Sequence, residues 1–258
     1  MHVLSVDAGS RSGQMQELIF ELCAETIDAC LAAREGGAHR IELCSGLSEG
    51  GITPSHGLIR DAVERSGLPV HVLVRPRGGD FVYSASEIDV MRRDILHIKE
   101  LGAAGAVFGI LRPDGRVDVE ATRALVQLAR PLEVTFHRAF DTTPSLPQAL
   151  EDVIATGADR LLTSGGERNV VAGSAALAGL VRLAGQRIEI AVGGGLRLEN
   201  AASFARATQA KHFHGSLRRR LKQTASPAEM AGESLSMGPQ YVVDADDVRA
   251  LIQQLVKD

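Results

Sequence analysis

The tripeptide Glu-Leu-Cys occurs twice near the start of the chain and brings together two carboxylates and two thiols. The copies are Glu21-Leu22-Cys23 and Glu42-Leu43-Cys44, and each ends a short apolar run. Alternate side chains of a β-strand share a face, so the Glu and Cys of each copy would point together, away from the Leu. Thiolates bind soft ions such as Cu(I), and paired carboxylates can act as general acid and base. We therefore expect the chemistry where these two segments meet.

The elements that position these residues follow a regular alternation of apolar, β-branched runs and helix-like stretches. The runs lie at 18–22, 40–43, 70–74, 106–110, 132–137, 160–163, 188–192 and 211–214. Eight strand–helix units in one chain predict an α/β fold, a single (β/α)8 TIM barrel, with a doubly wound open sheet as the alternative. Strands joined through helices are parallel, so both Glu-Leu-Cys copies would open at the same rim.

The two ends of the chain depart from this alternation. Residues 1–16 are polar and aperiodic, and we predict a disordered N-terminal extension before a barrel domain at 17–258. Residues 215–243 contain no strand-like run and precede a final helix that starts near Asp244. Connections of that length commonly act as lids or carry function.

Composition limits the classes of partner. The formal net charge of −4 argues against a nucleic-acid surface built on bulk positive charge. No stretch approaches the roughly 20 apolar residues of a membrane span, so we expect no membrane partner. Three cysteines do not make a secreted disulfide framework, and the N-terminus lacks a signal-peptide pattern. These features predict a cytoplasmic protein.

The later strand-like runs end in basic residues or in glycines, as expected for a binding rim at the carboxyl ends of barrel strands. The candidates for binding a small anion are Arg75, Arg77, Arg138, Gly165, Gly194, Gly195 and Gly215. Arginine forks bind carboxylate or phosphate, and glycine loops expose backbone N–H groups to phosphate. The catalytic candidates are Glu21, Glu42 and His137, the last because a histidine can transfer protons near neutral pH.

The two glutamates need partners if they point into the barrel, because a buried carboxylate must be paired, metal-bound or protonated. Arg75 and Arg138 are the expected partners at the same rim. One interpretation is an internal salt-bridge network whose charged groups pair only with one another and have no catalytic role. The other is a general acid–base pair whose pKa values are tuned by its neighbours.

The longer motifs resemble the CutC family. They are Glu42-Leu-Cys-Ser-Gly-Leu-Ser-Glu-Gly-Gly, Arg75-Pro-Arg-Gly-Gly-Asp-Phe, Thr135-Phe-His-Arg-Ala-Phe-Asp and Leu162-Thr-Ser-Gly-Gly, and the resemblance runs from about Leu18 to the C-terminus. It implies a TIM barrel, a cytoplasmic location, a role in copper homeostasis with Cu(I) binding, and a homodimer. Cys23 and Cys44 match cysteines that family members carry at the ends of their first two strands.

Two functions remain open at this point. The first is a cytosolic copper-handling protein that binds Cu(I) through Cys23 and Cys44, whose strands would lie about 4.8 Å apart. The plainer interpretation of these thiols is that small side chains pack well at a barrel mouth. The second is an enzyme that acts on a small anionic metabolite, phosphorylated or not, at the rim. Cys30 falls on an apolar helical face and is expected to fill the core.

Overall fold

The computed structural model describes residues 18–221 and 239–256, which form a closed barrel of parallel strands. The strands are β1 (Ile19–Ala24), β2 (Arg40–Leu43), β3 (Val70–Leu73), β4 (Gly105–Phe108), β5 (Glu133–Phe136), β6 (Arg160–Thr163), β7 (Glu189–Gly193) and β8 (His212–Gly215). Each strand pairs with the next, and β8 pairs with β1 to close the ring. The predicted (β/α)8 barrel is confirmed, with strand limits within two residues of the apolar runs.

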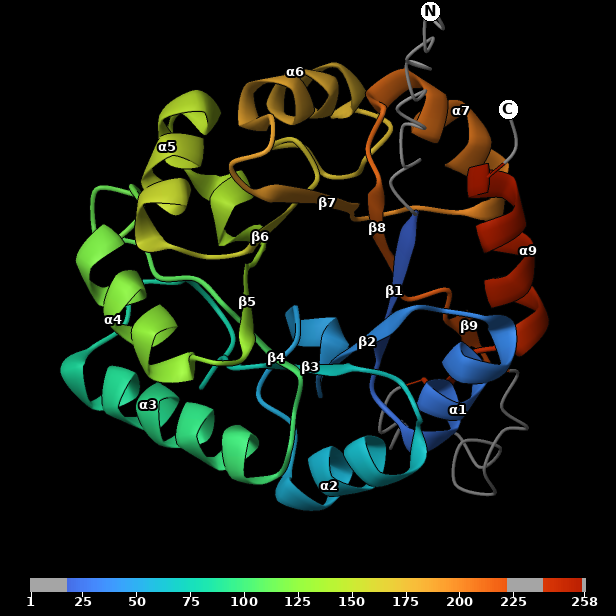
Figure 1. Cartoon of the computed structure of the whole chain (residues 1–258), viewed down its shortest axis with the longest axis horizontal. Coiled ribbons are helices and arrows are strands. Elements are labelled where there is room, and N and C mark those ends of the chain that lie inside the picture. Colours follow the sequence, from blue (N-terminus) through green and yellow to red (C-terminus); the bar gives the residue numbers. More distant parts are fainter. Residues whose placement is uncertain (1–17, 222–238, 257–258) are drawn as a thin grey trace, which may run out of the picture.

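Helices surround the ring of strands, as Figure 1 shows along the barrel axis. They are α1 (Ile27–Gly36), α2 (His56–Arg65), α3 (Ala85–Glu100), α4 (Val119–Ala129), α5 (Leu146–Thr156), α6 (Ser174–Ala184), α7 (Leu198–Thr208) and α9 (Ala245–Val256), with short 3-10 helices η1 (Leu47–Glu49) and η2 (Arg138–Thr142). Local signals set their ends. The Ser84 hydroxyl and the Glu87 carboxylate form a capping box at the start of α3. Gly37 ends α1 at a φ of 84°, which glycine adopts without strain.

The segment between β8 and the last helix is not free of strands. β9 (Arg219–Arg220) and β10 (Tyr241–Val242) pair as a short antiparallel ribbon, which corrects the expectation for 215–243. The final helix begins at Ala245, one residue from the predicted start, and lies beside α1 and α7 (Figure 1). The predicted extension at 1–16 lies outside the described residues. Among the described helices, none has both the length and the apolar character needed to cross a bilayer.

The two faces of the strands have different chemistry. Side chains such as Phe20, Leu22 and Ile41 are fully buried in the apolar cluster that the strands share with the helices. The alternate residues point into the barrel, and many are polar yet buried: Glu21, Arg40, Glu42, His71, Thr135, His137 and Arg160. A barrel interior is usually filled by layers of branched aliphatic side chains. Here, charged groups replace much of that filling, and they support the site above them.

Candidate functional site

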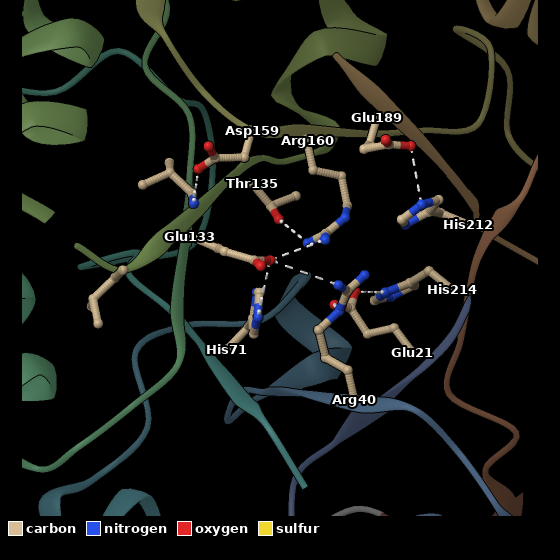
Figure 2. A network of polar contacts seen from close by, with 12 residues as sticks. Glu21, Arg40, His71, Glu133, Thr135, Asp159, Arg160, Glu189, His212 and His214 are labelled. Atoms are coloured by element: carbon tan, nitrogen blue, oxygen red, sulfur yellow. Dashed lines mark hydrogen bonds and ion pairs between the residues drawn. The ribbon is translucent and has the colours of Figure 1, made fainter. Parts of the chain in front are cut away.

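The amino ends of the strands contribute an ionic network inside the barrel (Figure 2). Glu133 at the start of β5 accepts a hydrogen bond from Arg160 Nη2 at 3.1 Å. Arg40 Nη1 lies 4.0 Å and His71 Nε2 3.8 Å from the same carboxylate oxygen. The Glu133 side chain is 56% exposed, so the network reaches solvent at the amino-terminal mouth. This layer closes the bottom of the barrel with paired charges.

Glu21 joins this network to the upper part of the barrel. Its Oε2 accepts from Arg40 Nε at 2.5 Å, and its Oε1 lies 2.8 Å from His214 Nδ1, which donates to the carboxylate. Burial alone would raise the pKa of Glu21, but Arg40 and His214 outweigh it and hold that pKa well below 4.5. The expectation that Arg75 and Arg138 pair with Glu21 is therefore wrong. Both of its oxygens are engaged below the rim, and its contacts orient His214.

The two thiols meet at the next level of the barrel, as predicted. Cys23 Sγ lies 3.7 Å from Cys44 Sγ, and both cysteines pack against Leu73 and Val107 in a small apolar cluster. The contact with Cys44 and the burial raise the pKa of the Cys23 thiol well above its usual value. Cys30 is also a free, buried cysteine, and burial raises its pKa to about 12, in keeping with a place in the core.

Glu42 lies beside the thiols, and one of its two carboxyl oxygens has no hydrogen-bond partner among the described residues. This oxygen is the buried Oε2, and the other, Oε1, is 3.7 Å from Cys23 Sγ. Burial raises the pKa of Glu42. Burial disfavours the charged form of His214, but the Glu42 and Glu21 carboxylates outweigh this and raise its pKa. The ligand atoms of Cys23, Glu42 and His214 lie within 4.8 Å of one another, so this group can hold a metal ion.

A cavity of about 310 Å³ opens at the carboxyl ends of the strands, directly over this group. Its polar and glycine lining consists of Cys23, Glu42, Gly50, His137, Arg138, Gly194, Gly195, Arg197, His214, Gly215, Ser216 and Arg218. The structure thus brings Glu42 and His137 to one cavity, together with three of the four candidate glycines. Glu21 does not line it.

His137 is neutral in this wall. Burial and the nearby Arg75 guanidinium lower its pKa to about 3. The sequence predicts a histidine that titrates near neutral pH, and this ring does not. Its Nδ1 accepts from the backbone N–H of Ala139 at 3.3 Å. Its Nε2 is buried and has no partner among the described residues. The histidine is suited to donate a hydrogen bond rather than to exchange protons.

Arg75 and Arg77 fasten loops and do not line the cavity. Arg75 is 4% exposed and donates to the backbone carbonyls of Glu49 at 3.0 Å, Gly51 at 2.8 Å and Gly79 at 2.7 Å. Arg77 Nε donates to Glu87 at 2.5 Å. Arg75 ties the loop after β2 to the loop after β3, and Arg77 fixes the loop after β3 to the start of α3. The anion-binding role expected for both is therefore not what their contacts serve.

Arg138 does reach the cavity. Its Nε donates to Asp141 at 2.8 Å and its Nη2 to Ser164 at 2.7 Å, which fixes the guanidinium against the loop after β6. Gly194 makes room for it: its φ is +106°, and a Cβ there would lie 3.2 Å from Arg138 Nη1. Gly165 has another role, since its N–H donates to Thr163 Oγ1 at 2.9 Å and it does not line the cavity.

The sequence patterns do not identify His214, Arg40 or Arg160 as site residues, although all three make polar contacts inside the barrel. A signal for His214 exists in the glycine opposite it. A Cβ on Gly193 would lie 2.9 Å from the His214 Cβ, so the glycine at the carboxyl end of β7 leaves space for the histidine on the neighbouring strand. Gly109 does the same for His137, whose Nδ1 would lie 2.7 Å from an added Cβ.

Comparison with known proteins places the chain in a family. The CutC family model matches residues 18–219. The chain belongs to the CutC family. A family protein CutC from Chromobacterium violaceum is 45% identical over 246 residues, which are 93% of this chain and 98% of the relative.

Solved structures agree with this assignment and with the fold. The CutC protein from Streptococcus agalactiae, provisionally described as a copper homeostasis protein, is 35% identical with a TM-score of 0.73, over 77% of this chain and 98% of that one. The N-(5'-phosphoribosyl)anthranilate isomerase from Pyrococcus furiosus is only 13% identical, with a TM-score of 0.54 over 93% of this chain and 98% of that one. That second likeness shows the barrel fold alone.

Proposed function

We propose that this CutC family protein handles copper in the cytoplasm and binds Cu(I) through the thiolates of Cys23 and Cys44. The observation that carries the proposal is a pair of free, buried thiols 3.7 Å apart in an apolar cluster. Soft thiolate ligands select Cu(I) over hard cations. The description of the Streptococcus agalactiae relative agrees with this role.

The separation of the two sulfur atoms fits a bent arrangement. With metal–thiolate bonds of roughly 2.3 Å, the length found for zinc, two sulfurs about 3.7 Å apart meet the metal near the tetrahedral angle. A linear arrangement with the same bonds would need about 4.6 Å between the sulfurs. The pair therefore calls for a third ligand from the surrounding side chains.

We propose His214 as the third ligand, because a ring nitrogen of His214 lies within 4.8 Å of the Cys23 sulfur. The group that can hold a metal includes Glu42 and not Cys44, so binding through both thiolates and His214 requires these side chains to shift. The Nδ1 of His214 donates to Glu21, so Nε2 can offer its lone pair to a metal once the ring is uncharged. Because the pKa of His214 is raised, copper competes with a proton at this nitrogen. A histidine ligand commonly donates its other ring N–H to a carboxylate, which fixes the tautomer and the ring orientation. Imidazole also suits copper better than the carboxylate of Glu42 does. Glu21 then supports the copper site from below without touching the ion.

Copper reaches the pair from the cavity. Cys23 is 4% exposed and lines the cavity, whereas Cys44 is fully buried behind it. Because the pKa of Cys23 is raised, its thiol is protonated at neutral pH and loses its proton when copper binds.

An anaerobic Cu(I) competition titration tests the proposal. Cys23→Ser and Cys44→Ser should each weaken Cu(I) binding at least about 100-fold, because each removes a direct ligand and loss of an outer-shell partner alone costs about 10–100-fold. Cys30→Ala is the matched control, since Cys30 is equally buried but lies outside the thiol pair, and it should leave the affinity unchanged. Unchanged affinity in both serine variants would overturn the proposal.

A further inference from the structure

The cavity above the thiols contains polar groups for which copper binding has no use. His137, Arg138 and Arg197 line it, and none of them belongs to the group that can hold a metal. At about 310 Å³, the cavity lies at the lower end of the range for small-molecule sites. What these groups would recognise follows from their charge and from their unused hydrogen-bonding atoms.

His137 offers one buried donor. A neutral imidazole has one N–H and one acceptor nitrogen, and Nδ1 is the acceptor because it takes the Ala139 N–H. Nε2 therefore carries the hydrogen, and it has no partner in the described part of the chain although the residue is only 6% exposed. Buried polar groups are nearly always hydrogen-bonded, so an unpaired N–H in a cavity wall marks a place for the oxygen of a ligand.

The charge of the lining favours an anion. Three arginines, Arg138, Arg197 and Arg218, line the cavity, against one acidic residue, Glu42. Arg138 and Arg218 are paired with Asp141 and Glu25, whereas Arg197 is exposed at the cavity.

Backbone geometry adds to this charge. Gly194 and Gly195 line the cavity in the left-handed region, with φ values of +106° and +82°. They lead directly to Arg197, the N-cap of the 11-residue helix α7. The amino end of a helix presents free N–H groups and a partial positive charge to anions.

We infer that this cavity binds a small organic anion, a carboxylate or a phosphate monoester, with the anionic group at Arg197 and the start of α7. A further oxygen of the same molecule accepts the His137 Nε2–H. The inference goes beyond copper handling and does not depend on it, because Arg197 and His137 line the cavity without being among the proposed copper ligands.

Isothermal titration of the full-length protein with malonate and with glycerol 3-phosphate, at constant ionic strength, tests the inference. We expect saturable binding of at least one probe, and the probe that binds distinguishes a carboxylate from a phosphate ligand. Arg197→Gln should weaken that binding about tenfold or more, the usual loss for a hydrogen bond to a charged group. Arg112→Gln is the matched control. It removes the same charge from an exposed loop that does not line the cavity, and it should change the affinity less than about twofold.

His137 supplies a second, independent comparison. His137→Leu removes the donor and should also weaken binding about tenfold, whereas His137→Gln keeps an N–H at similar reach and should retain most of the affinity. Cys44→Ser should leave anion binding unchanged, so the copper proposal and this one can fail separately. The inference is overturned if neither probe binds saturably, or if Arg197→Gln binds as tightly as Arg112→Gln.

Discussion

Replacing Glu21 with glutamine removes a buried carboxylate that is bonded to both Arg40 and His214. Glu21 is 1% exposed and the Arg40 side chain 8%, so neither charge can turn to solvent. Removing one partner of a buried ion pair costs about 3–5 kcal/mol, because the other charge stays buried without compensation. Domains commonly have unfolding free energies of about 5–15 kcal/mol, so the loss is a large fraction of the total. At about 2–4 °C per kcal/mol, the melting temperature should fall by roughly 6–20 °C.

The pH dependence of this loss follows from the lowered pKa of Glu21. In the folded protein the pKa lies well below 4.5, so the carboxylate stays charged where the unfolded chain already takes up a proton. The stabilisation is fully present above the unfolded pKa and is lost as the pH falls through the folded one. The stability difference between wild type and Glu21→Gln should therefore be complete at pH 7 and narrow below about pH 4.5.

Urea denaturation followed by circular dichroism measures the effect. Glu64→Gln is the matched control, because Glu64 pairs with Arg60 at 2.9 Å on the surface and its side chain is 56% exposed. That control should lose less than about 0.5 kcal/mol. A loss below about 1 kcal/mol for Glu21→Gln, or one equal to the control, would refute the argument that this carboxylate holds the barrel interior together.

Three further outcomes are expected. Gly194→Ala should lower the unfolding free energy by about 1–3 kcal/mol, since a φ of +106° strains any other residue and the new Cβ would lie 3.2 Å from Arg138 Nη1; an unchanged denaturation midpoint would contradict this. Asp141→Asn should cost about 2–3 kcal/mol in the same assay, because its carboxylate accepts from Arg138, Thr163 and the Ser164 backbone; wild-type stability would speak against that role. Cu(I) affinity should rise at least about tenfold per pH unit between pH 6 and 8, because binding releases the Cys23 proton together with any proton held by the other ligands, and competition titrations that show no pH dependence would exclude that step.

The barrel could be predicted because its signals are local and repeated. Each strand shows as an apolar run, and helix limits such as the Ser84–Glu87 capping box are set within a few residues. To predict that Cys23 and Cys44 meet, we needed one further assumption, that two consecutive parallel strands pair with each other. In the structure, β1 and β2 pair Cys23 with Glu42 and Ala24 with Leu43. Cys44 is therefore the first residue after the last pair of the two strands.

The partners of the charged groups could not be predicted, because they depend on the register between strands and on loop paths. Glu21 lies beside Arg40 at the start of β2, and beside His214 only because β8 closes the barrel against β1. Arg75 sits at the rim as expected, but backbone carbonyls of two loops surround its guanidinium. Neither arrangement leaves a mark in composition or periodicity.

Anomalous diffraction at the copper edge, from anaerobic crystals loaded with Cu(I), tests the copper site most directly. The account predicts a single strong peak within bonding distance of Cys23 Sγ and Cys44 Sγ, with His214 as the third ligand. The exposed His56–His97 pair, whose ring nitrogens are 3.0 Å apart, offers copper a surface alternative. Copper at that pair or elsewhere on the surface, with none between the thiols, would contradict the account.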